Sequence, residues 1–541
     1  MQRQVLRPAG FREWPDGTIT TRYGFQHAIY QYLWQEHVSP GQWQQYHQRI
    51  GERKEAGYGQ RAEEIAAELA VHFEEGRDYQ RAVQYRRLAG ENAIRRHATR
   101  EAIVHLIKGL DFLPKLPDTS ARQQQELRLL NALGPLLLGT KGYANQDAER
   151  VYLRTQELYQ EFNEGPSNIR GLWGLWAYHF MRCHFKEAHV LTEQFVQLAE
   201  QQADSALMVK AHEMLGPMLF HEGQFRCARE HLELGSALYN RQQHYELVFV
   251  YGQDPQAVLL SYTAMCLWVL GYPDQARERS HQALIGVQEI AHPYSQGFAT
   301  LLASGFHQLQ GEPHKMQEQA ETAITLAAEH DFAQVIAQAM GHRGWALAKQ
   351  GRTEEGLAQL QKSLDSFRAT GAELELPHTL GLLAEAQAAG GQTEEGLSTV
   401  TEALTILERT GEHYYEAELY RLKGELTLAQ SSVQSLGSSV KKSSKFKVQS
   451  SKSHNTDPRP LIPDPQAEAE ACFLKAIAVA RGQEAKSWEL RATISLSRLW
   501  QRQGKRHEAH QVLSDIYSWF TEGFDTKDLQ EAKALLAELS C

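Results

Sequence analysis

The side chains that most resemble a metal-binding pair lie near the C-terminus, in the segment His507-Glu508-Ala509-His510. A zinc-protease helix needs its two histidines four residues apart, so that both imidazoles and the glutamate share one face of the helix. Here the histidines are three residues apart. We therefore expect this segment to belong to a surface helix, and the sequence predicts no metal site.

Nucleotide hydrolysis would require a phosphate-binding loop of the form GxxxxGK[ST]. The pair Gly504-Lys505 lacks both the leading glycine and the hydroxyl residue of that motif. The 24 histidines are scattered, and no Ser/His/Asp or Cys/His arrangement stands out. The sequence therefore predicts a protein that is not an enzyme, with no catalytic residue and no cofactor.

Charge and cysteine content predict a soluble protein of a reducing compartment. Lys and Arg total 56 against 66 Asp and Glu, and the net charge of −10 argues against general adhesion to nucleic acid. The five cysteines are far apart and form no CxxC pair. The most apolar stretch, Ala257 to Leu270, is too short to span a bilayer. We expect a cytoplasmic location and no membrane contact.

One segment is strongly basic. No acidic residue occurs from Ser431 until Asp457, and five lysines lie in this Ser-rich run: Lys441, Lys442, Lys445, Lys447 and Lys452. They could form a mobile arm that contacts phosphates of RNA or DNA, or an acidic partner. The alternative, which we favour, is a solvated insertion loop with no partner.

The N-terminal segment, up to about residue 60, differs from the rest of the chain. Phe11 to Phe25 contains a Pro-Asp-Gly turn between aromatic and β-branched residues, which predicts a β-hairpin. A helix is expected from His27 to His37, and Ser39-Pro40 should cap a second one from about Gln42 to Lys54. This pattern is typical of the end of a winged-helix domain. Arg12 and Arg22 could contact DNA, although a structural cap is the favoured interpretation because no recognition helix precedes the hairpin.

Six glycines mark a helical repeat: Gly223, Gly271, Gly311, Gly351, Gly391 and Gly504. Seven residues before each stands a small residue, in the order Gly216, Ala264, Ser304, Gly344, Ala384 and Ser497. Five residues after each stand Ala228, Ala276, Met316, Gly356, Gly396 and Ala509. The steps from Gly271 to Gly391 are 40 residues each, which fits two helices and two turns. The sequence predicts an all-α solenoid of helix hairpins in which the two helices cross closely at the small residues.

The 40-residue cadence also predicts the domain boundaries. The interval from Gly391 to Gly504 equals two repeats plus 33, and Gly424 and Ala469 keep the phase of the small residues. We expect a winged-helix-like fragment over 1–60, a repeat array over 61–430, and a disordered Ser/Lys-rich insertion within one repeat over 431–463. The array is then completed over 464–541, with the helix over 466–481 packed on the helix over 416–430.

In such an array the first helix of each pair lines the inner groove. Counting from the glycine turns gives these groove candidates: Lys210, Glu213, His221, Ser261, Trp268, Gln338, Trp345 and Lys349. An exposed tryptophan beside Lys or Gln would suit a peptide, with the indole as the apolar anchor. Tryptophan at helical spacing is also a common core residue, so Trp268 and Trp345 keep both interpretations.

The units Gly351-Arg-Thr-Glu-Glu-Gly-Leu357 and Gly391-Gln-Thr-Glu-Glu-Gly-Leu397 resemble tetratricopeptide repeats of a lengthened type. That resemblance covers roughly residue 61 to the C-terminus and implies architecture only.

A sharper resemblance rests on Arg22-Tyr-Gly-Phe-Gln-His-Ala-Ile-Tyr30, Leu69-Ala-Val-His-Phe73, Arg81-Ala-Val-Gln-Tyr85, Lys141-Gly-Tyr143 and Trp519-Phe-Thr-Glu-Gly-Phe-Asp525. These segments look like the C-terminal half of large bacterial predicted ATPases of the signal-transducing NTPase class, often fused to an adenylate or guanylate cyclase or a regulatory domain. In those proteins an NTPase core precedes a winged helix and a long repeat array, which the resemblance implies to sense or dock a partner. The NTPase core has no counterpart in this sequence, so no nucleotide-binding residue is carried over. The chain is then either a truncated or split member of that class, or the partner of a separate catalytic polypeptide.

Two hypotheses of function follow. The first is a non-enzymatic protein-interaction scaffold, the sensor or docking arm of an NTPase- or cyclase-linked signalling system, with a protein or peptide in the repeat groove. The second is a DNA-associated transcriptional regulator that uses the winged-helix-like N-terminus.

Overall fold

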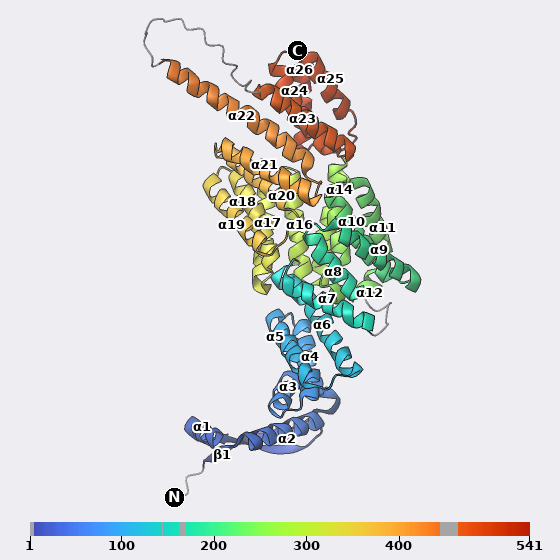
Figure 1. The fold of residues 1–541 in the computed structure, drawn as a ribbon, viewed down its shortest axis with the longest axis vertical. Coiled ribbons are helices and arrows are strands. Elements are labelled where there is room, and N and C mark those ends of the chain that lie inside the picture. The colour runs from blue at the N-terminus through green and yellow to red at the C-terminus, as the bar shows by residue number, and fades with distance from the viewer. Residues whose placement is uncertain (1–4, 143, 162–168, 444–463, 541) are drawn as a thin grey trace. The chain divides into compact units, whose positions relative to one another are not determined.

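A computed structural model describes residues 5–142, 144–161, 169–443 and 464–540 of the chain (Figure 1). The chain divides into two compact units. Unit 1 comprises Met1–Leu137 and Arg150–Gly171, and unit 2 comprises Leu138–Glu149 and Leu172–Cys541. Among the described residues, no helix combines the length and the apolar composition that crossing a membrane requires.

Unit 1 begins with an antiparallel β-hairpin of β1 (Leu6–Glu13) and β2 (Ile19–Phe25). Gly17 in its turn has a φ of +79°, a conformation that glycine adopts without steric cost. Helix α1 (Ala28–His37) follows, and α2 (Pro40–Tyr58) begins with a capping box in which the Ser39 side chain accepts from the Gln42 N–H. The predicted hairpin and the Ser39-Pro40 helix start are confirmed.

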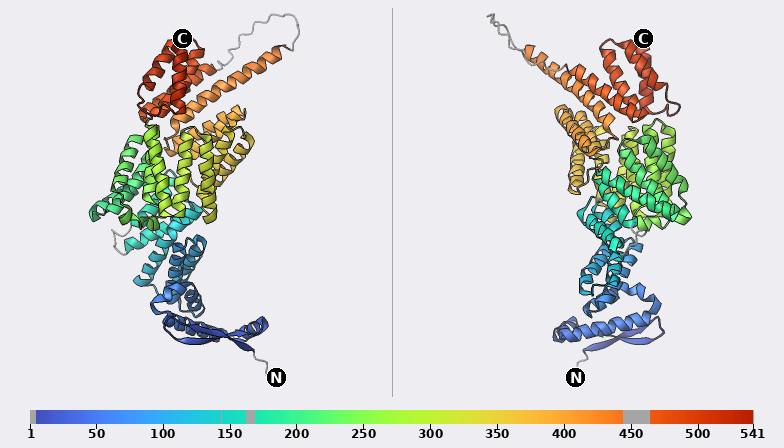
Figure 2. Two further views of the ribbon diagram at one scale, coloured as in Figure 1. Left: turned by 180° about the vertical axis from the view of Figure 1, so that it is seen from behind. Right: turned by 45° about the vertical axis from the view of Figure 1, so that its right-hand side comes forward.

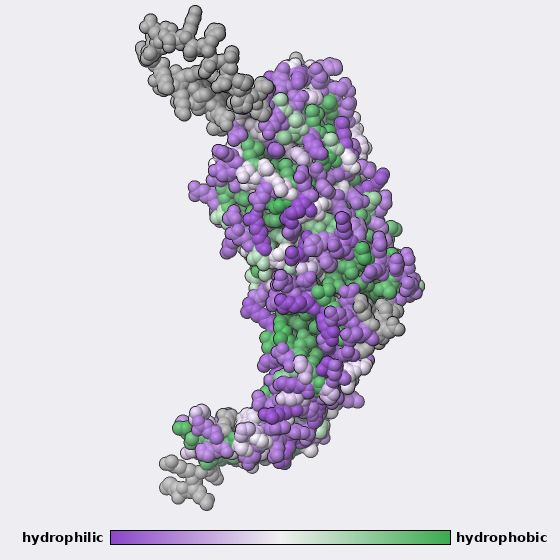
Figure 3. All heavy atoms as spheres, viewed as in Figure 1, coloured by the Kyte–Doolittle hydropathy of each residue, from purple (hydrophilic) through white to green (hydrophobic). Residues whose placement is uncertain are grey.

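The hairpin is attached to α2, and both views of Figure 2 show the two lying alongside each other. Arg53 on α2 pairs with Asp16 in the hairpin turn at 2.9 Å, and the Asp16 N–H donates to the Gly57 carbonyl at 3.1 Å. The ring of Trp14 meets that of Tyr58 edge-on at 6.2 Å. The N-terminal elements of unit 1 nevertheless leave apolar side chains in solvent. Ile29 and Leu33 on α1 are 54% and 44% exposed, and a few hydrophobic residues are visible among polar ones at this end of the chain in Figure 3.

The remaining elements of unit 1 are helices in the predicted style. They are the 3-10 helices η1 (Gly59–Ile65) and η2 (Leu113–Lys115) and the α-helices α3 (Ala66–Glu75), α4 (Tyr79–Arg95), α5 (Thr99–Phe112), α6 (Ser120–Lys141) and α7 (Gln146–Glu161). The repeat array expected from residue 61 therefore begins within the 3-10 helix η1. The last residues of α6 and the first of α7, within Leu138–Glu149, belong to unit 2. The break between α6 and α7 falls at Gly142, with φ +91°, while Gly139 lies inside α6.

Unit 2 consists of helices that follow one another as hairpins. They are α8 (Ile169–Met181), α9 (Phe185–Gln202), α10 (Ser205–His221), α11 (Phe225–Leu238), α12 (Arg241–His244), α13 (Leu247–Tyr251), α14 (Pro255–Val269), α15 (Pro273–Ile290), α16 (Pro293–Leu309), α17 (Pro313–His330), α18 (Ala333–Lys349), α19 (Thr353–Ala369), α20 (Leu376–Ala389), α21 (Thr393–Thr410), α22 (Glu416–Ser443), α23 (Pro465–Gly482), α24 (Lys486–Arg502), α25 (Arg506–Tyr517) and α26 (Lys527–Ser540). The pairs are α8/α9, α10/α11 and those from α14/α15 to α24/α25. In each pair we call the earlier helix in the chain the first helix and the later one the second.

The six repeat glycines all end a first helix with a left-handed backbone, at φ values from +69° for Gly311 to +94° for Gly271. The small residues beside them lie where the two helices of a pair cross. A Cβ added to Gly356 would stand 2.4 Å from the Gly344 carbonyl oxygen, so this crossing has no room for a side chain. Where serine replaces the first small residue, its hydroxyl bonds across the crossing, from Ser304 Oγ to the Met316 carbonyl at 3.0 Å. The structure confirms a tetratricopeptide-like helix-hairpin solenoid.

A second set of left-handed residues marks the turns between successive pairs. Ala291, Asp331, Gly371 and Gly411 recur at the same 40-residue step as the glycines, and Glu484 follows after one repeat plus 33. The extra residues therefore fall between α22 and α23. These two helices pack together at Gly424, where an added Cβ would stand 2.6 Å from the Phe473 ring.

The start of the insertion differs from the sequence prediction. Helix α22 runs on to Ser443, whereas the pattern predicted a loop from Ser431. Residues 431–443 contain no proline, and their one glycine, Gly437, costs a helix only about 1 kcal/mol relative to alanine, so the composition of this stretch allows the helix to continue. The rest of the predicted insertion, 444–463, lies outside the described residues.

Unit 2 winds until its later turns meet its earlier ones. The Met181 carbonyl, at the end of α8, accepts from the N–H groups of Glu373 and Leu374 at 2.9 and 3.1 Å. The His221 carbonyl, one repeat later at the end of α10, accepts from His413 and Tyr414 at 2.8 and 3.1 Å. We call residues 373–375 and 412–414, together with Met181 and His221, the seam. Its hydrogen bonds join residues that are far apart in the chain.

Candidate functional site

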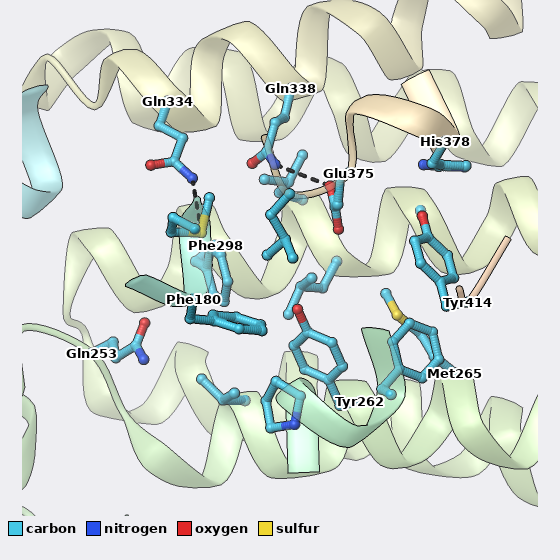
Figure 4. A pocket seen from close by; sticks show the side chains of 18 of the residues that line it. Phe180, Gln253, Tyr262, Met265, Phe298, Gln334, Gln338, Glu375, His378 and Tyr414 are labelled. Carbon is cyan, nitrogen blue, oxygen red and sulfur yellow. Dashed lines mark hydrogen bonds between the residues drawn. The ribbon is translucent and has the colours of Figure 1, made fainter. Parts of the chain in front are cut away.

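The interior of the unit 2 superhelix holds a cavity of about 90 Å³, measured as the space open to the centres of water molecules (Figure 4). Its walls come from the first helices α8, α10, α14, α16, α18 and α20, together with the turns before α14, α20 and α22. The first helices therefore face inward, as the repeat pattern predicts. Since one water needs roughly 10–15 Å³ on this measure, the cavity has room for about six to nine water-sized groups.

Most of the cavity wall is aromatic or apolar. Figure 4 shows Phe180 from α8, Tyr262 and Met265 from α14, and Phe298 from α16 around the same space. Tyr414 closes the wall from the seam. Aromatic faces and methionine sulfur are polarisable and adapt to an apolar or cationic group. Such a wall can bind a ligand of that kind.

Glu375 is the acidic residue at the seam that points into this space (Figure 4). Its backbone is left-handed, with φ +64°, although it is not a glycine and belongs to neither 40-residue set of turns. Such a conformation is strained and persists only where its surroundings hold it. The Gln338 Nε2–H donates to Glu375 Oε2 at 3.0 Å. Among the described residues, no Lys or Arg forms an ion pair with Glu375, and burial raises the pKa of its carboxyl.

A second carboxyl, Glu412, lies behind Glu375 in the seam. The Glu375 N–H donates to both of its oxygens, at 2.8 and 3.0 Å, and Glu412 Oε1 lies 2.9 Å from Nδ1 of the fully buried His221. Burial raises the pKa of Glu412 to about 8 and lowers that of His221 to about 4. Near pH 7 the proton therefore stays on Glu412, which donates to the neutral imidazole. The other ring nitrogen then donates to the Tyr262 hydroxyl at 3.3 Å.

An ion pair borders the cavity on the α10 side. Lys210 Nζ lies 2.8 Å from both carboxylate oxygens of Glu213, and the two side chains are 0% and 2% exposed. The Lys210 ammonium also lies 4.6 Å from the ring centroids of Trp173 and Tyr251. Gln253 donates to Glu213 Oε1 at 2.8 Å. This ammonium is thus held by a carboxylate and two aromatic faces in the protein interior.

Two more histidines line the cavity in neutral form. Burial lowers the pKa of His342 to about 4 and that of His378 to about 3. His378 Nε2 donates to Gln308 Oε1 at 3.3 Å, and His342 Nδ1 bonds to the Ser304 hydroxyl at 3.1 Å. Near pH 7 these side chains add no positive charge to the cavity. Near pH 7 the charge on the lining therefore comes from the carboxyls of Glu213 and Glu375, and Glu213 is already paired with Lys210 behind the cavity wall.

The predicted groove residues separate into two groups. Glu213 and Gln338 line the cavity, and Lys210 and His221 lie directly behind it. The other four do not line it. Ser261 is buried, Trp268 is 3% exposed beneath the Arg491 guanidinium, and Trp345 is 4% exposed and donates to Glu385 at 3.1 Å. The exposed Lys349 pairs with the same Glu385 at 2.7 Å. The two tryptophans are therefore buried.

The other candidates lie away from the cavity or outside the described part of the chain. Lys441 and Lys442 fall within α22, and their side chains are outside the described part of the structure, as are Lys445, Lys447 and Lys452 altogether. His507 is exposed at the start of α25, and among the described residues no group of three or more His, Cys, Asp or Glu could hold a metal ion.

Several cavity residues could have been found from the sequence with the same cadence. Val258, Phe298, Gln338 and His378 all line the cavity and are 40 residues apart. Extending the step from Gln338 in both directions identifies the other three. Glu375 has no such periodic counterpart, because it depends on an irregular turn that occurs once in the described repeats.

Comparisons with known proteins give limited matches. No protein-family model matches the chain. A protein of Rhizobium meliloti (strain 1021), described as uncharacterized, is 25% identical over 411 residues, which are 75% of this chain and 40% of that protein. The chain thus spans well under half the length of this relative.

Among solved structures, the likeness is at low sequence identity. The Rap protein complexed with Competence and Sporulation Factor is 12% identical with a TM-score of 0.41, over 64% of this chain and 99% of that one. The apo form of RapI is 11% identical with a TM-score of 0.36, over 61% and 99% of the two chains. The helix pairs of unit 2, with their repeated glycine turns and close crossings, are those of a tetratricopeptide-like solenoid.

Proposed function

We propose that this chain is a protein-interaction scaffold that serves as the sensor or docking arm of an NTPase- or cyclase-linked bacterial signalling system. The observation that carries this proposal is the convergence of successive first helices on one cavity at the seam. The signalling context rests on the sequence resemblance described above, and a protein or peptide is the expected partner. The NTPase or cyclase component would be that partner or part of the same assembly.

The seam gives such a scaffold a way to respond to what it binds. Repeat arrays deform through many small changes between neighbours, because each repeat contacts mainly the next one. In unit 2 the seam adds contacts between residues far apart in the chain, from Met181 to Glu373 and from His221 to His413. A molecule that contacts both sides of the seam stabilises the closed superhelix relative to an open one. The surface offered to a partner would change accordingly.

The proposal is tested by affinity capture with the purified full-length chain as bait. Enrichment of a polypeptide that carries a phosphate-binding loop or a cyclase domain is the expected result, and the interaction should be reproduced with that polypeptide in purified form. Stoichiometric ATP binding or ATP turnover by the purified chain alone would contradict the proposal. A matched bait with Ser487→Ala, which removes the 2.5 Å hydrogen bond from Ser487 Oγ to the Trp268 carbonyl between distant repeats, reports whether capture depends on the wound form.

A DNA-associated regulator is the second candidate, favoured by the confirmed hairpin in unit 1. Arg22 on β2 is exposed, whereas Arg12 on β1 bonds to the Tyr58 hydroxyl at 2.8 Å and stacks over Trp14. A wing that reads DNA would use Arg22, through a phosphate contact that salt weakens. Electrophoretic mobility shifts at about 50 and 200 mM salt, with the chain and its Arg22→Ala variant, test this. Equal mobility of duplex DNA with and without the chain at both salt concentrations would exclude it.

A further inference from the structure

The carboxyl of Glu375 is held in an unusual position for an acidic side chain. It faces a cavity with aromatic walls, it receives one side-chain hydrogen bond, from Gln338, and among the described residues it has no cationic partner. Glu375 is half-buried at the cavity surface, and carboxylates withdrawn from bulk water are normally paired, because an unpaired charge there is costly. A left-handed backbone at a non-glycine residue keeps the carboxyl directed into the space (Figure 4). The fold thus places the Glu375 carboxyl at the cavity, where no described Lys or Arg side chain pairs with it.

The protein shows at Lys210 how its interior holds an ammonium group. There a carboxylate at 2.8 Å and two aromatic rings at 4.6 Å surround the Nζ atom, and an amide from Gln253 orients the carboxylate. The Glu375 site has the corresponding parts, namely a carboxyl, the orienting amide of Gln338, and aromatic faces that include Tyr262 and Phe298. Among the residues that the structure describes, no side chain supplies an ammonium group there.

The size and walls of the cavity limit what can supply that group. Space for about six to nine water-sized groups admits one unbranched chain or one ring, and does not admit a folded segment. The apolar walls favour a ligand whose remaining atoms are hydrocarbon. The acidic and neutral groups that line the cavity disfavour an anion.

We propose that this cavity binds a small organic cation, a protonated amine on a short hydrocarbon body, whose ammonium group pairs with Glu375 while its body lies against the aromatic wall. The same chemistry could come from a free amine or from a lysine side chain of a partner. Bound there, the cation contacts Glu375 in the seam and stabilises the wound superhelix. The proposal adds a ligand class to the sensor function proposed above and rests on that function only for its biological meaning.

The test is calorimetric titration of the full-length chain with matched probes. The probes are hexylammonium, its uncharged analogue 1-hexanol, and Nα-acetyl-lysine amide, which represents a partner's lysine. The variants are Glu375→Gln and, as a matched control, Glu373→Gln, since Glu373 lies in the same turn but pairs outward with Arg409 at 2.8 Å. Hydrogen exchange of peptides from the seam, measured with and without probe, shows whether the probe stabilises the hydrogen bonds that join the distant turns.

We expect saturable one-to-one binding of a cationic probe, at least about tenfold tighter than binding of 1-hexanol, because a charged hydrogen bond to a buried carboxylate is lost with the alcohol. Glu375→Gln should lower the affinity for the cationic probe by about tenfold or more and leave the affinity for 1-hexanol unchanged. Glu373→Gln should change neither affinity. The seam amides of Glu373, Leu374, His413 and Tyr414 should exchange more slowly in the complex. Tighter binding by hexylammonium identifies a free amine as the source, and tighter binding by the lysine derivative identifies a partner's side chain.

Binding of the cation should also depend on pH. Burial raises the pKa of Glu375, so its carboxyl takes up a proton at a higher pH than an exposed glutamate does, and binding of hexylammonium but not of 1-hexanol should weaken as the pH falls. The other ionisable groups around the site are Glu213 and Lys210 with His221 on α10, Tyr262 on α14, His342 on α18, His378 on α20, and Glu412 and Tyr414 at the seam. Of these, Glu412 also takes up a proton as the pH falls, because burial raises its pKa to about 8. The histidines gain no charge above pH 6, because burial lowers the pKa of His221 and His342 to about 4 and that of His378 to about 3. The comparison of hexylammonium with 1-hexanol at a single pH needs no variant, so it remains decisive if Glu375→Gln fails to fold.

Absence of binding by both cations, or equal binding of hexylammonium and 1-hexanol, would overturn the proposal. So would an unchanged affinity for the cations in a folded Glu375→Gln chain. A chain that binds the amines but captures no NTPase or cyclase component would support this inference and contradict the proposed signalling partner. The reverse result would contradict the ligand alone.

Discussion

The buried pair of Lys210 and Glu213 allows a sharp test of how this interior tolerates charge. Lys210→Met keeps an unbranched apolar side chain of similar length and removes only the ammonium group. Gln253 still donates to Glu213 at 2.8 Å, in a site where the Glu213 side chain is 2% exposed. Removing one partner of a buried pair costs about 3–5 kcal/mol, because the remaining charge is uncompensated. Protonation of Glu213 in the variant would remove the uncompensated charge and so reduce this cost.

The cost of protonating the glutamate gives a second, independent estimate of the loss of stability. An ordinary glutamate ionises near pH 4.3, so keeping one neutral at pH 7 costs about 3.7 kcal/mol at 1.36 kcal/mol per pH unit. The two estimates agree, and they predict that the loss of stability shrinks as the pH falls from 7 to 5. In the double variant Lys210→Met/Glu213→Gln no charge is left in the site, so most of the stability should return.

The assay is native-state hydrogen exchange of peptides from α10 and α14, since unfolding of a repeat array need not be two-state. A loss of about 3–5 kcal/mol corresponds to roughly a hundred- to several-thousand-fold faster exchange at pH 7. The double variant should exchange within about tenfold of the unsubstituted chain. A Lys210→Met chain that exchanges less than about fivefold faster, or a double variant as labile as the single one, would refute the reasoning.

Four other variants test the crossing, one buried histidine and the hairpin. Gly356→Ala places a Cβ 2.4 Å from the Gly344 carbonyl and should destabilise the α18/α19 pair by about 1–3 kcal/mol, while Gly286→Ala, with nothing within 4 Å, should stabilise α15 by about 0.5–1 kcal/mol. Urea midpoints that move in the same direction would contradict this. Burial lowers the pKa of His378 from 6.5 to about 3, so its stabilising contribution is present above pH 6.5 and is lost as the pH falls, by about 1.4 kcal/mol per unit. In the His378→Gln variant the free energy of unfolding should therefore fall less as the pH is lowered. If the free energy of unfolding in urea fell equally in both chains between pH 6.5 and 4.5, the imidazole would not be neutral and buried. Gly17→Ala forces a side chain into a left-handed turn at φ +79° and should destabilise the hairpin by about 1 kcal/mol, seen as faster exchange in residues 6–25 alone.

The repeat architecture could be read from the sequence because it depends on local chemistry. A first helix of each pair ends where only glycine adopts a left-handed backbone at no cost, and the helices cross where only small side chains fit. Both requirements recur at fixed spacing, so Gly271 to Gly391 predict the hairpins and Gly424 keeps the count through the insertion. The Pro-Asp-Gly turn and the Ser39 cap are local in the same way.

The candidate site was predictable only in part. The cadence placed Glu213 and Gln338 on inward-facing helices, and the same 40-residue step from Gln338 leads to Phe298 and His378. It could not show that Trp268 and Trp345 are buried, because burial depends on how far the superhelix winds before its turns meet.

The sequence by itself therefore determined the repeat, its turns, its close crossings and the position of the insertion, all of which follow from interactions between residues near one another in the chain. Only the tertiary structure decided that the superhelix closes, since the seam joins Met181 to Glu373 and His221 to His413 through backbone groups that every residue type carries. Backbone hydrogen bonds leave no mark on side-chain pattern, and small changes of angle at each repeat add up over the array. The meeting of Glu375 with Gln338 and Tyr262 in one cavity is a consequence of that closure.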